Sequence, residues 1–173
     1  MRELADAGRI REFMKALAAS ARADCRVYLT GGATAVLYGW RSSTIDVDMR
    51  PVPESDDLLR ALVKIKESLQ LNVELAWPGQ FIPEISGWED RSVFIAKEDK
   101  ISFYHYDPYS QALAKIERGH RQDLVDVKEL LLRGFVEPSK LRGYFDAIEP
   151  QLYRFPAVDV KAFRKALSES LKP

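Results

Sequence analysis

Two consecutive glycines, Gly31 and Gly32, impose the strongest constraint on the fold, because they follow a β-prone segment directly. Residues 25–30 are rich in side chains that favour strands, and residues 33–38 form a short helical stretch that Gly39 can end. Glycine adopts backbone conformations that are closed to residues with a Cβ atom. The pattern therefore predicts a strand, a tight turn and a helix in immediate succession.

The next strand-like segment alternates apolar and acidic residues. Asp46 and Asp48 are two positions apart, so both carboxylates point to one face of the predicted strand, roughly 7 Å apart. Ile45, Val47 and Met49 then turn toward the opposite face, which we expect to meet the core. A solvent-facing edge strand shows the same alternation, so the acidic pair alone does not identify a site.

Acidic residues and a glycine turn together favour a site for a metal ion and a nucleotide. Mg²⁺ usually binds one or two carboxylates together with substrate phosphates, and Mn²⁺ accepts the same oxygen ligands. The Gly31–Gly32 turn precedes a helix, where exposed N–H groups favour anions, and we expect a side chain at Gly32 to block phosphate with little effect on thermal stability. Arg41, Ser43 and Thr44 follow, and each is a candidate contact to phosphate oxygens.

The remaining chain divides into a mixed half and a helical half. In the first half we expect helices at residues 4–21 and 56–69, a strand at 72–76, a long loop at 77–91 and a hairpin formed by 92–96 and 101–106. After Asp107 and Pro108 we expect helices at residues 109–118, 122–132, 139–148 and 159–171. This order predicts an α+β fold, with a core of residues 1–106 and a helical segment of residues 107–173 packed on it.

Composition and charge limit the kinds of partner and the cellular location that we expect for this protein. The 26 basic and 26 acidic side chains cancel, so the net charge gives no reason to expect generic nucleic-acid binding, although it leaves a local basic patch open. The chain has no apolar run of about 18 residues and no secretion signal, so we expect a cytoplasmic protein without a membrane partner. Cys25 is the single cysteine and is expected to be a core residue.

The glycine turn and the acidic strand together resemble a known family. Residues 29–37, Leu-Thr-Gly-Gly-Ala-Thr-Ala-Val-Leu, together with Arg41, Thr44, Asp46 and Asp48, resemble the signature of the nucleotidyltransferase superfamily. They are most similar to the branch that holds the nucleotidyltransferase toxins of bacterial abortive-infection and type IV toxin–antitoxin systems and their uncharacterised relatives. The resemblance implies a mixed sheet with flanking helices, Mg²⁺ at the two aspartates and a nucleoside triphosphate on the turn.

The resemblance also implies roles for two residues further along the chain. Glu74 matches by position a third carboxylate that helps to deprotonate the attacking hydroxyl or to hold the metal, although a solvated strand residue fits the same pattern. Lys115 matches a lysine that meets the triphosphate, although it also fits a solvated helix position. Asp123 and Asp126 are expected to be charges favoured near a helix N-terminus.

Two classes of function follow from these residues. The first is an enzyme that transfers a nucleoside monophosphate from a nucleoside triphosphate to a hydroxyl of RNA or protein. The alternative is a non-catalytic module that binds a nucleotide or a partner protein, for example one member of a toxin–antitoxin pair. Ala33, where many family members have serine, and Glu74, where aspartate is commoner, favour the alternative. His105 and His120 complete no recognisable catalytic or metal-binding set, so we expect structural roles for them.

Overall fold

The computed structural model describes residues 2–173, and the chain divides into two compact units. The first unit contains the residues up to Trp77 together with Ser92–Tyr106, and the second contains Pro78–Arg91 and Asp107–Pro173. The chain enters the second unit for its remaining length at Asp107, where the sequence changes to helix, and residues 78–91 group with this helical part. A domain boundary at residue 106 stays a prediction.

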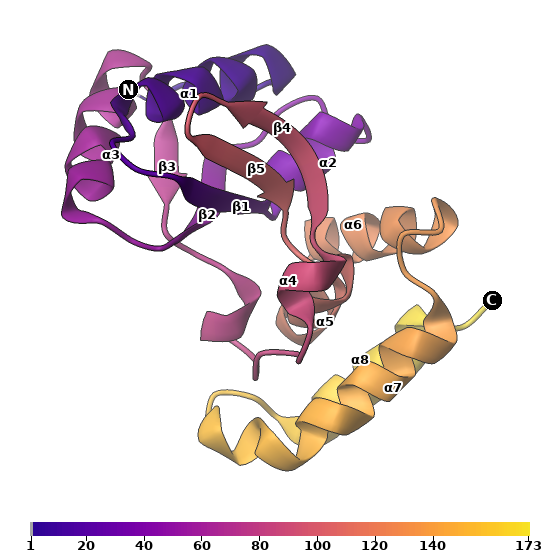
Figure 1. Ribbon diagram of the computed structural model, residues 1–173. Helices are drawn as coiled ribbons and strands as arrows, with labels where there is room; N and C mark the ends of the chain where they lie inside the picture. The colour runs from indigo at the N-terminus through magenta and orange to yellow at the C-terminus, as the bar shows by residue number, and fades with distance from the viewer. Residues whose placement is uncertain (1) are drawn as a thin grey trace. The chain divides into compact units, whose positions relative to one another are not determined.

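The first unit is built on one mixed sheet (Figure 1). Its strands are β1 (Cys25–Thr30), β2 (Asp46–Val52), β3 (Asn72–Glu74), β4 (Val93–Glu98) and β5 (Ile101–His105), in the order β3-β2-β1-β5-β4. β1 pairs antiparallel with β2 and parallel with β5, β2 pairs parallel with β3, and β4 forms a hairpin with β5. The predicted α+β class is confirmed.

Three helices accompany this sheet: α1 (Ala7–Ser20), α2 (Gly32–Tyr38) and α3 (Asp56–Ser68). The side chains of Asp6 and Ser55 cap α1 and α3 by accepting hydrogen bonds from the N–H groups of Arg9 and Leu58, at 2.9 Å and 3.2 Å. The core gathers one set of sheet side chains, Val27, Leu29, Val47, Met49, Val73, Ile101 and Phe103, with apolar residues of all three helices. One face of the sheet therefore supplies the core.

The structure corrects the predicted extent of two strands. β2 begins only at Asp46, so Ile45 lies outside the strand and is 68% exposed instead of buried. β2 continues through Pro51 to Val52, because β3 pairs only with Asp46–Asp48 and leaves the far edge of β2 without a neighbouring strand at the proline. Proline is tolerated on such an edge since it has no N–H to donate. β3 ends at Glu74, before the predicted residue 76.

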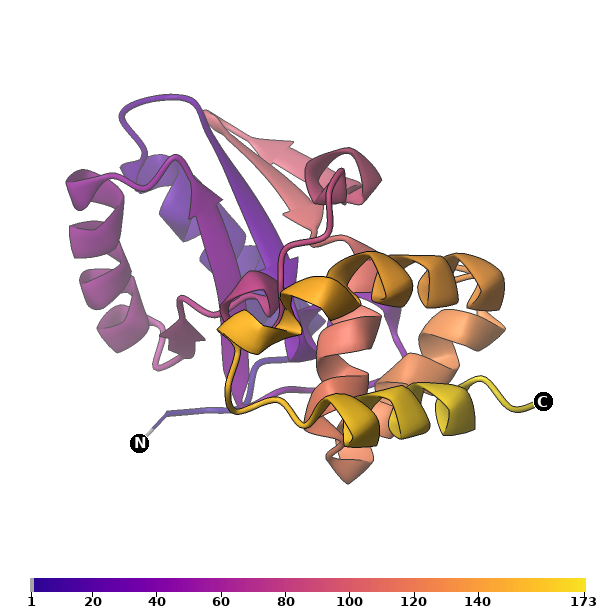
Figure 2. The ribbon, with the colours of Figure 1, turned by 90° about the horizontal axis from the view of Figure 1, so that it is seen from below.

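The second unit is helical. It contains α5 (Pro108–Arg118), α6 (Arg121–Leu132), α7 (Pro138–Ile148) and α8 (Val160–Ser170), with short helices η1 (Pro78–Gln80), α4 (Trp88–Arg91) and η2 (Glu149–Arg154). α5 packs against α6, α7 and α8 (Figure 2). No strand follows residue 105 in the described chain, as predicted, and none of the described helices is long and apolar enough to cross a membrane.

A buried aspartate explains why residues 78–91 belong to the second unit instead of forming a free loop. Asp107 is fully buried and caps α5 by accepting from the N–H groups of Tyr109 and Ser110, at 3.1 Å and 3.3 Å. The guanidinium of Arg91 pairs with the same carboxylate at 2.9 Å and lies 4.3 Å from the ring centre of Tyr144. A buried carboxylate needs such a counter-charge, so α4 is held to the helical unit.

A second buried ion pair joins α5 to α6. The ammonium of Lys115 lies 2.7 Å from the Asp126 carboxylate and 3.6 Å from that of Asp123. Asp123 also accepts from Arg118 at 2.7 Å and from the backbone N–H of His120 at 3.2 Å. Burial acts to raise the pKa of Asp123, but the bonds from Arg118 and the charge of Lys115 outweigh it, so the pKa is lowered. Asp123 does lie in the first turn of α6, as expected, but both aspartates are also buried ion-pair partners, which the sequence did not predict.

The buried pair predicts a large loss of stability in Lys115→Met. The substitution leaves the fully buried Asp126 carboxylate without its counter-charge, so we expect the free energy of unfolding to fall by about 3 to 5 kcal/mol in urea titrations. Lys115→Met with Asp126→Leu should recover most of that loss. The control Lys128→Met, on the exposed side of α6, should change stability by less than about 0.5 kcal/mol. Equal stability of Lys115→Met and Lys128→Met would contradict the argument.

Candidate functional site

The strand register gathers three predicted carboxylates on one face of the sheet. Thr30 of β1 lies opposite Asp48 of β2, which in turn lies beside Glu74 of β3, while Asp46 lies beside Asn72. Residues that pair directly across strands share a face. This face, which we call the Asp48 face, is opposite to the one that supplies the core.

Asn72 links two of the carboxylates, and sequence reasoning did not single it out. Its side-chain amide donates to Oδ1 of Asp46 and to Oε1 of Glu74, the latter at 3.2 Å. The amide nitrogen has two N–H donors, so one side chain orients both acids. The sequence position of Asn72 could have identified it, because it precedes Glu74 by two residues and its side chain therefore points to the same face of the strand.

Gly31 brings the turn backbone against the acidic pair. Its φ of +65° is a conformation that favours glycine, and a Cβ atom at this position would lie 3.0 Å from Oδ2 of Asp48. A side chain would therefore occupy the space beside the carboxylate. The turn that the two glycines predict therefore lies next to the strand that carries Asp46 and Asp48.

Gly32 makes a different close approach, toward the loop before β2. A Cβ atom on Gly32 would lie 2.7 Å from Cβ of Thr44 and 2.9 Å from Nη1 of Arg41. Thr44 is itself buried; its hydroxyl donates to the carbonyl of Asp46 at 3.1 Å, and its backbone pairs with Ala5. A side chain at Gly32 must displace this packing, so the expectation that its replacement barely affects stability is wrong.

These contacts assemble most of the predicted site residues within the first unit. Arg41 and Thr44 adjoin the turn at Gly32, and the half-buried Ser43 precedes Thr44 in the same loop. Lys115 lies in the second unit, in its ion pair with Asp126. Whether these side chains contact a nucleotide stays a prediction.

The acids fit a cation that also binds substrate. Within residues 2–173, no three His, Cys, Asp or Glu side chains form a cluster able to hold a metal ion by themselves. Asp46 and Asp48 nevertheless share a face, and the glycine at position 31 leaves room beside the Asp48 carboxylate. Two carboxylates completed by substrate phosphates and water are a usual ligand set for Mg²⁺. The residues therefore fit such an ion, with the nucleotide supplying the remaining ligands.

His105 supports the helix that begins at the glycine turn. Its Nδ1 lies 3.1 Å from the hydroxyl of Thr34 in α2, and its ring stacks on Tyr38 with centroids 4.2 Å apart. Burial lowers the pKa of His105 to about 4, and the charge of Arg11 adds to the effect. A neutral imidazole thus holds α2 against β5, in keeping with a structural role.

The lowered pKa predicts acid sensitivity. The unfolded chain binds a proton at His105 near pH 6.5 but the folded chain only near pH 4, so the free energy of unfolding should fall as pH drops through this interval, by on the order of 3 kcal/mol. His105→Phe should flatten this part of the profile in urea titrations. The control is Lys128→Met, on the exposed side of α6, which should leave the profile unchanged. A His105→Phe profile parallel to that of the wild type would refute the assignment.

Comparison with known proteins agrees with this geometry. Residues 8–171 match the model of a family described as "nucleotidyltransferase of unknown function (DUF6036)". Neither the curated proteins nor the solved structures gave a significant match. The match spans all five strands and the helices of both units, and the similarity to the toxin branch stays a prediction. The chain therefore belongs to this nucleotidyltransferase family.

Proposed function

We propose that this protein transfers a nucleoside monophosphate from a nucleoside triphosphate to a hydroxyl of RNA or protein. The observation that supports the proposal best is the approach of Gly31 to Asp48, because it puts a glycine turn beside a carboxylate that shares its face with Asp46 and Glu74. A turn able to receive phosphate and a set of acids are the two components that nucleotidyl transfer needs, and here they adjoin.

The triphosphate binds at the turn in this proposal. The Gly31–Gly32 backbone offers N–H groups without a side chain in the way, and Arg41, Ser43 and Thr44 offer a guanidinium and two hydroxyls nearby. The expected contact of Lys115 with the triphosphate stays a prediction, because this lysine belongs to the second unit.

Asp46 and Asp48 would hold Mg²⁺ or Mn²⁺ together with the phosphates. When bound, the ion neutralises charge that builds up on the phosphate oxygens. The chain's own contribution is to fix the two carboxylates: the strand holds both on one face, and the amide of Asn72 orients that of Asp46. Such preorganised charge is the main source of catalysis in phosphoryl-type transfers.

Glu74 serves as the proton acceptor. As the acceptor hydroxyl forms its bond to the α-phosphorus, the bond to the leaving pyrophosphate breaks, and the hydroxyl proton passes to the carboxylate of Glu74. This side chain is exposed, lies beside Asp48 in register and is oriented by Asn72. A positioned general base of this kind typically contributes roughly 100-fold or more to the rate.

The alternative, a non-catalytic nucleotide-binding or partner-binding module of a toxin–antitoxin system, remains the competing proposal. Ala33 favours it, because this residue follows the turn without the hydroxyl that many family members have there. The two proposals differ in whether metal-dependent transfer takes place, so a single substitution in the acidic pair separates them.

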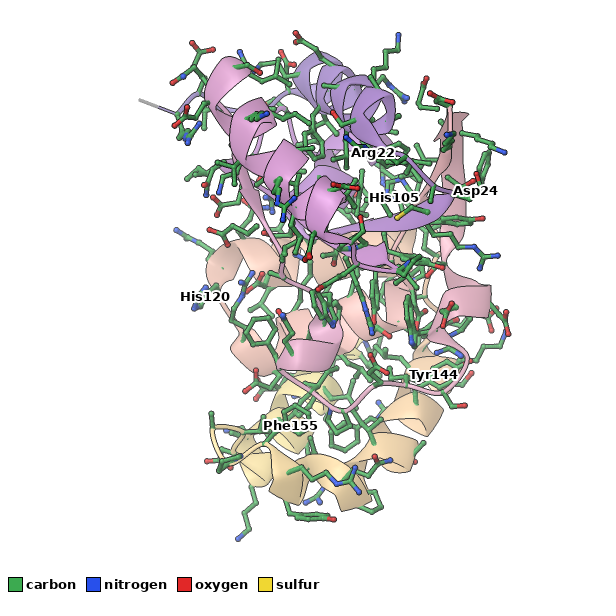
Figure 3. The ribbon with its side chains drawn as sticks, turned by 60° about the vertical axis from the view of Figure 1, so that its left-hand side comes forward. Arg22, Asp24, His105, His120, Tyr144 and Phe155 are labelled. Atoms are coloured by element: carbon green, nitrogen blue, oxygen red, sulfur yellow. The ribbon has the colours of Figure 1, made fainter. Side chains whose placement is uncertain are left out.

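Asp48→Asn should abolish transfer without unfolding the protein. Removing one charge from the cation site should reduce Mg²⁺-dependent transfer of α-labelled nucleotide to bulk RNA or cell-extract protein by about 100-fold or more. Without metal the two carboxylates repel, so the melting temperature of the free protein should stay unchanged or rise slightly. The control is Asp24→Asn, an exposed carboxylate just before β1 (Figure 3), which should behave like the wild type in both measurements.

A different result would favour the non-catalytic module. If Mg²⁺ with each nucleoside triphosphate in turn neither labels an acceptor nor raises the melting temperature of the wild type, and Asp48→Asn behaves identically, transfer is excluded. If a nucleotide raises the melting temperature equally in both proteins without labelling, the chain binds nucleotides but does not transfer them.

A further inference from the structure

A row of aromatic side chains on the Asp48 face runs from β4 toward the strand that carries Asp48. Phe94 of β4, Tyr104 of β5, Tyr28 of β1 and Arg50 of β2 lie opposite one another in consecutive strand pairs. The rings of Phe94 and Tyr104 have centroids 5.7 Å apart, and those of Tyr104 and Tyr28 are 5.3 Å apart and stacked. The row thus ends at Arg50, two residues beyond Asp48 and on the same face of β2.

Basic side chains form a second row beside the aromatic one. Lys97 of β4 pairs with Ser102 of β5, which pairs with Arg26 of β1, and Arg26 has the same parity as Tyr28. Lys97 reaches this face only because the β4–β5 pairing shifts by one residue at Ile95. Without that bulge, Phe94 and Lys97, three residues apart, would point to opposite faces.

The outer part of these rows is accessible. Phe94 is 57% exposed, Arg26 and Lys97 are exposed, and Tyr104 is half-buried, whereas Tyr28 and Thr30, nearer the acids, are buried. The guanidinium of Arg50 lies 4.9 Å from the ring centre of Trp77 and 3.4 Å from the hydroxyl of Tyr106, so it is held beside the acids. Although the whole chain has zero net charge, this part of the sheet combines cations with aromatic rings.

We propose that these rows bind a single-stranded nucleic acid, and that this strand is the acceptor whose terminal hydroxyl meets Glu74. The inference rests on the proposed transfer reaction and names its acceptor. Bases stack on Phe94 and Tyr104, while Arg26 and Lys97 meet the phosphates. Single-strand binding surfaces in general combine cations along the backbone with aromatic rings under the bases.

The geometry favours a nucleic acid over a protein acceptor. β4 and β3, the strand of Glu74, are four strand spacings apart, roughly 19 Å, which a few nucleotides of an extended strand can span. Repeating phosphates match repeating cations, and stacked bases match the exposed face of Phe94. A hydroxyl-bearing protein side chain needs neither feature.

Binding of short fluorescent oligonucleotides tests the proposal directly. Fluorescence anisotropy with oligouridine and oligothymidine should show salt-dependent binding by the whole protein. Phe94→Ala should weaken it about tenfold, while Phe94→Tyr, which keeps a stacking ring, should stay within about twofold of the wild type. The control Tyr153→Ala removes an exposed ring from the second unit and should leave affinity unchanged.

The salt dependence separates the basic row from a general loss of stability. Lys97→Ala should reduce the slope of log affinity against log salt by about 0.7, the value expected for one lost phosphate contact on a single strand. Lys64→Ala, on the exposed side of α3, should leave the slope unchanged. Tighter binding of oligouridine identifies RNA as the acceptor, and tighter binding of oligothymidine identifies DNA; either result supports the proposal.

The outcomes distinguish this inference from the transfer reaction. If neither oligonucleotide binds, or Phe94→Ala and Lys97→Ala bind like the wild type, the nucleic-acid surface is refuted even when protein becomes labelled. If binding follows the expected pattern but no nucleotide is ever transferred, the transfer reaction fails and the binding surface stands. Asp48→Asn should still bind the strand while transferring nothing to it.

Discussion

The close approach of the glycine turn to its two neighbours is the constraint on which the site depends. Gly31 leaves room for the Asp48 carboxylate, and Gly32 leaves room for Thr44 and Arg41. Both contacts follow from the antiparallel pairing of β1 and β2, which sets Thr30 opposite Asp48 just before the turn. A larger residue at either glycine would separate the turn from the strand, so the same packing that closes this part of the fold also assembles the candidate site.

The sheet divides its two faces between stability and chemistry. Val47 and Met49 turn into the core, while Asp46, Asp48 and Arg50 turn the other way, so a single strand serves both purposes. Strand side chains alternate with a period of two, and a register slip of one residue would bury the acids and expose the core. Packing of the apolar side chains of β2 in the core therefore also fixes the positions of its acidic side chains on the opposite face.

The sequence predicts those features that depend on neighbours along the chain. The strand, turn and helix around Gly31 and the alternation at Asp46 and Asp48 are local patterns, and the structure has both. The role of Asn72 and the ion-pair partner of Lys115 depend instead on which strands and helices lie next to each other. A single sequence does not specify the pairing of strands or the packing of helices. The expected loop at residues 77–91 contains two short helices, η1 and α4, and its ion pair with the buried Asp107 likewise depends on a contact between residues distant in the sequence.

The neutral net charge gave no sign of a local electrostatic feature, because the acids and the exposed cations of the Asp48 face lie on different strands. Asp46, Asp48 and Glu74 lie on β2 and β3, whereas Arg26 and Lys97 lie on β1 and β4. Carboxylates that attract a cation also repel a polyanion, and this repulsion is screened over about 10 Å at roughly 0.1 M salt. Since β4 lies roughly 14 Å from β2, the part of a nucleic-acid strand that lies on Phe94 and Lys97 feels little of it. Only its terminal nucleotide would meet the acids, at the point where a bound cation offsets their charge.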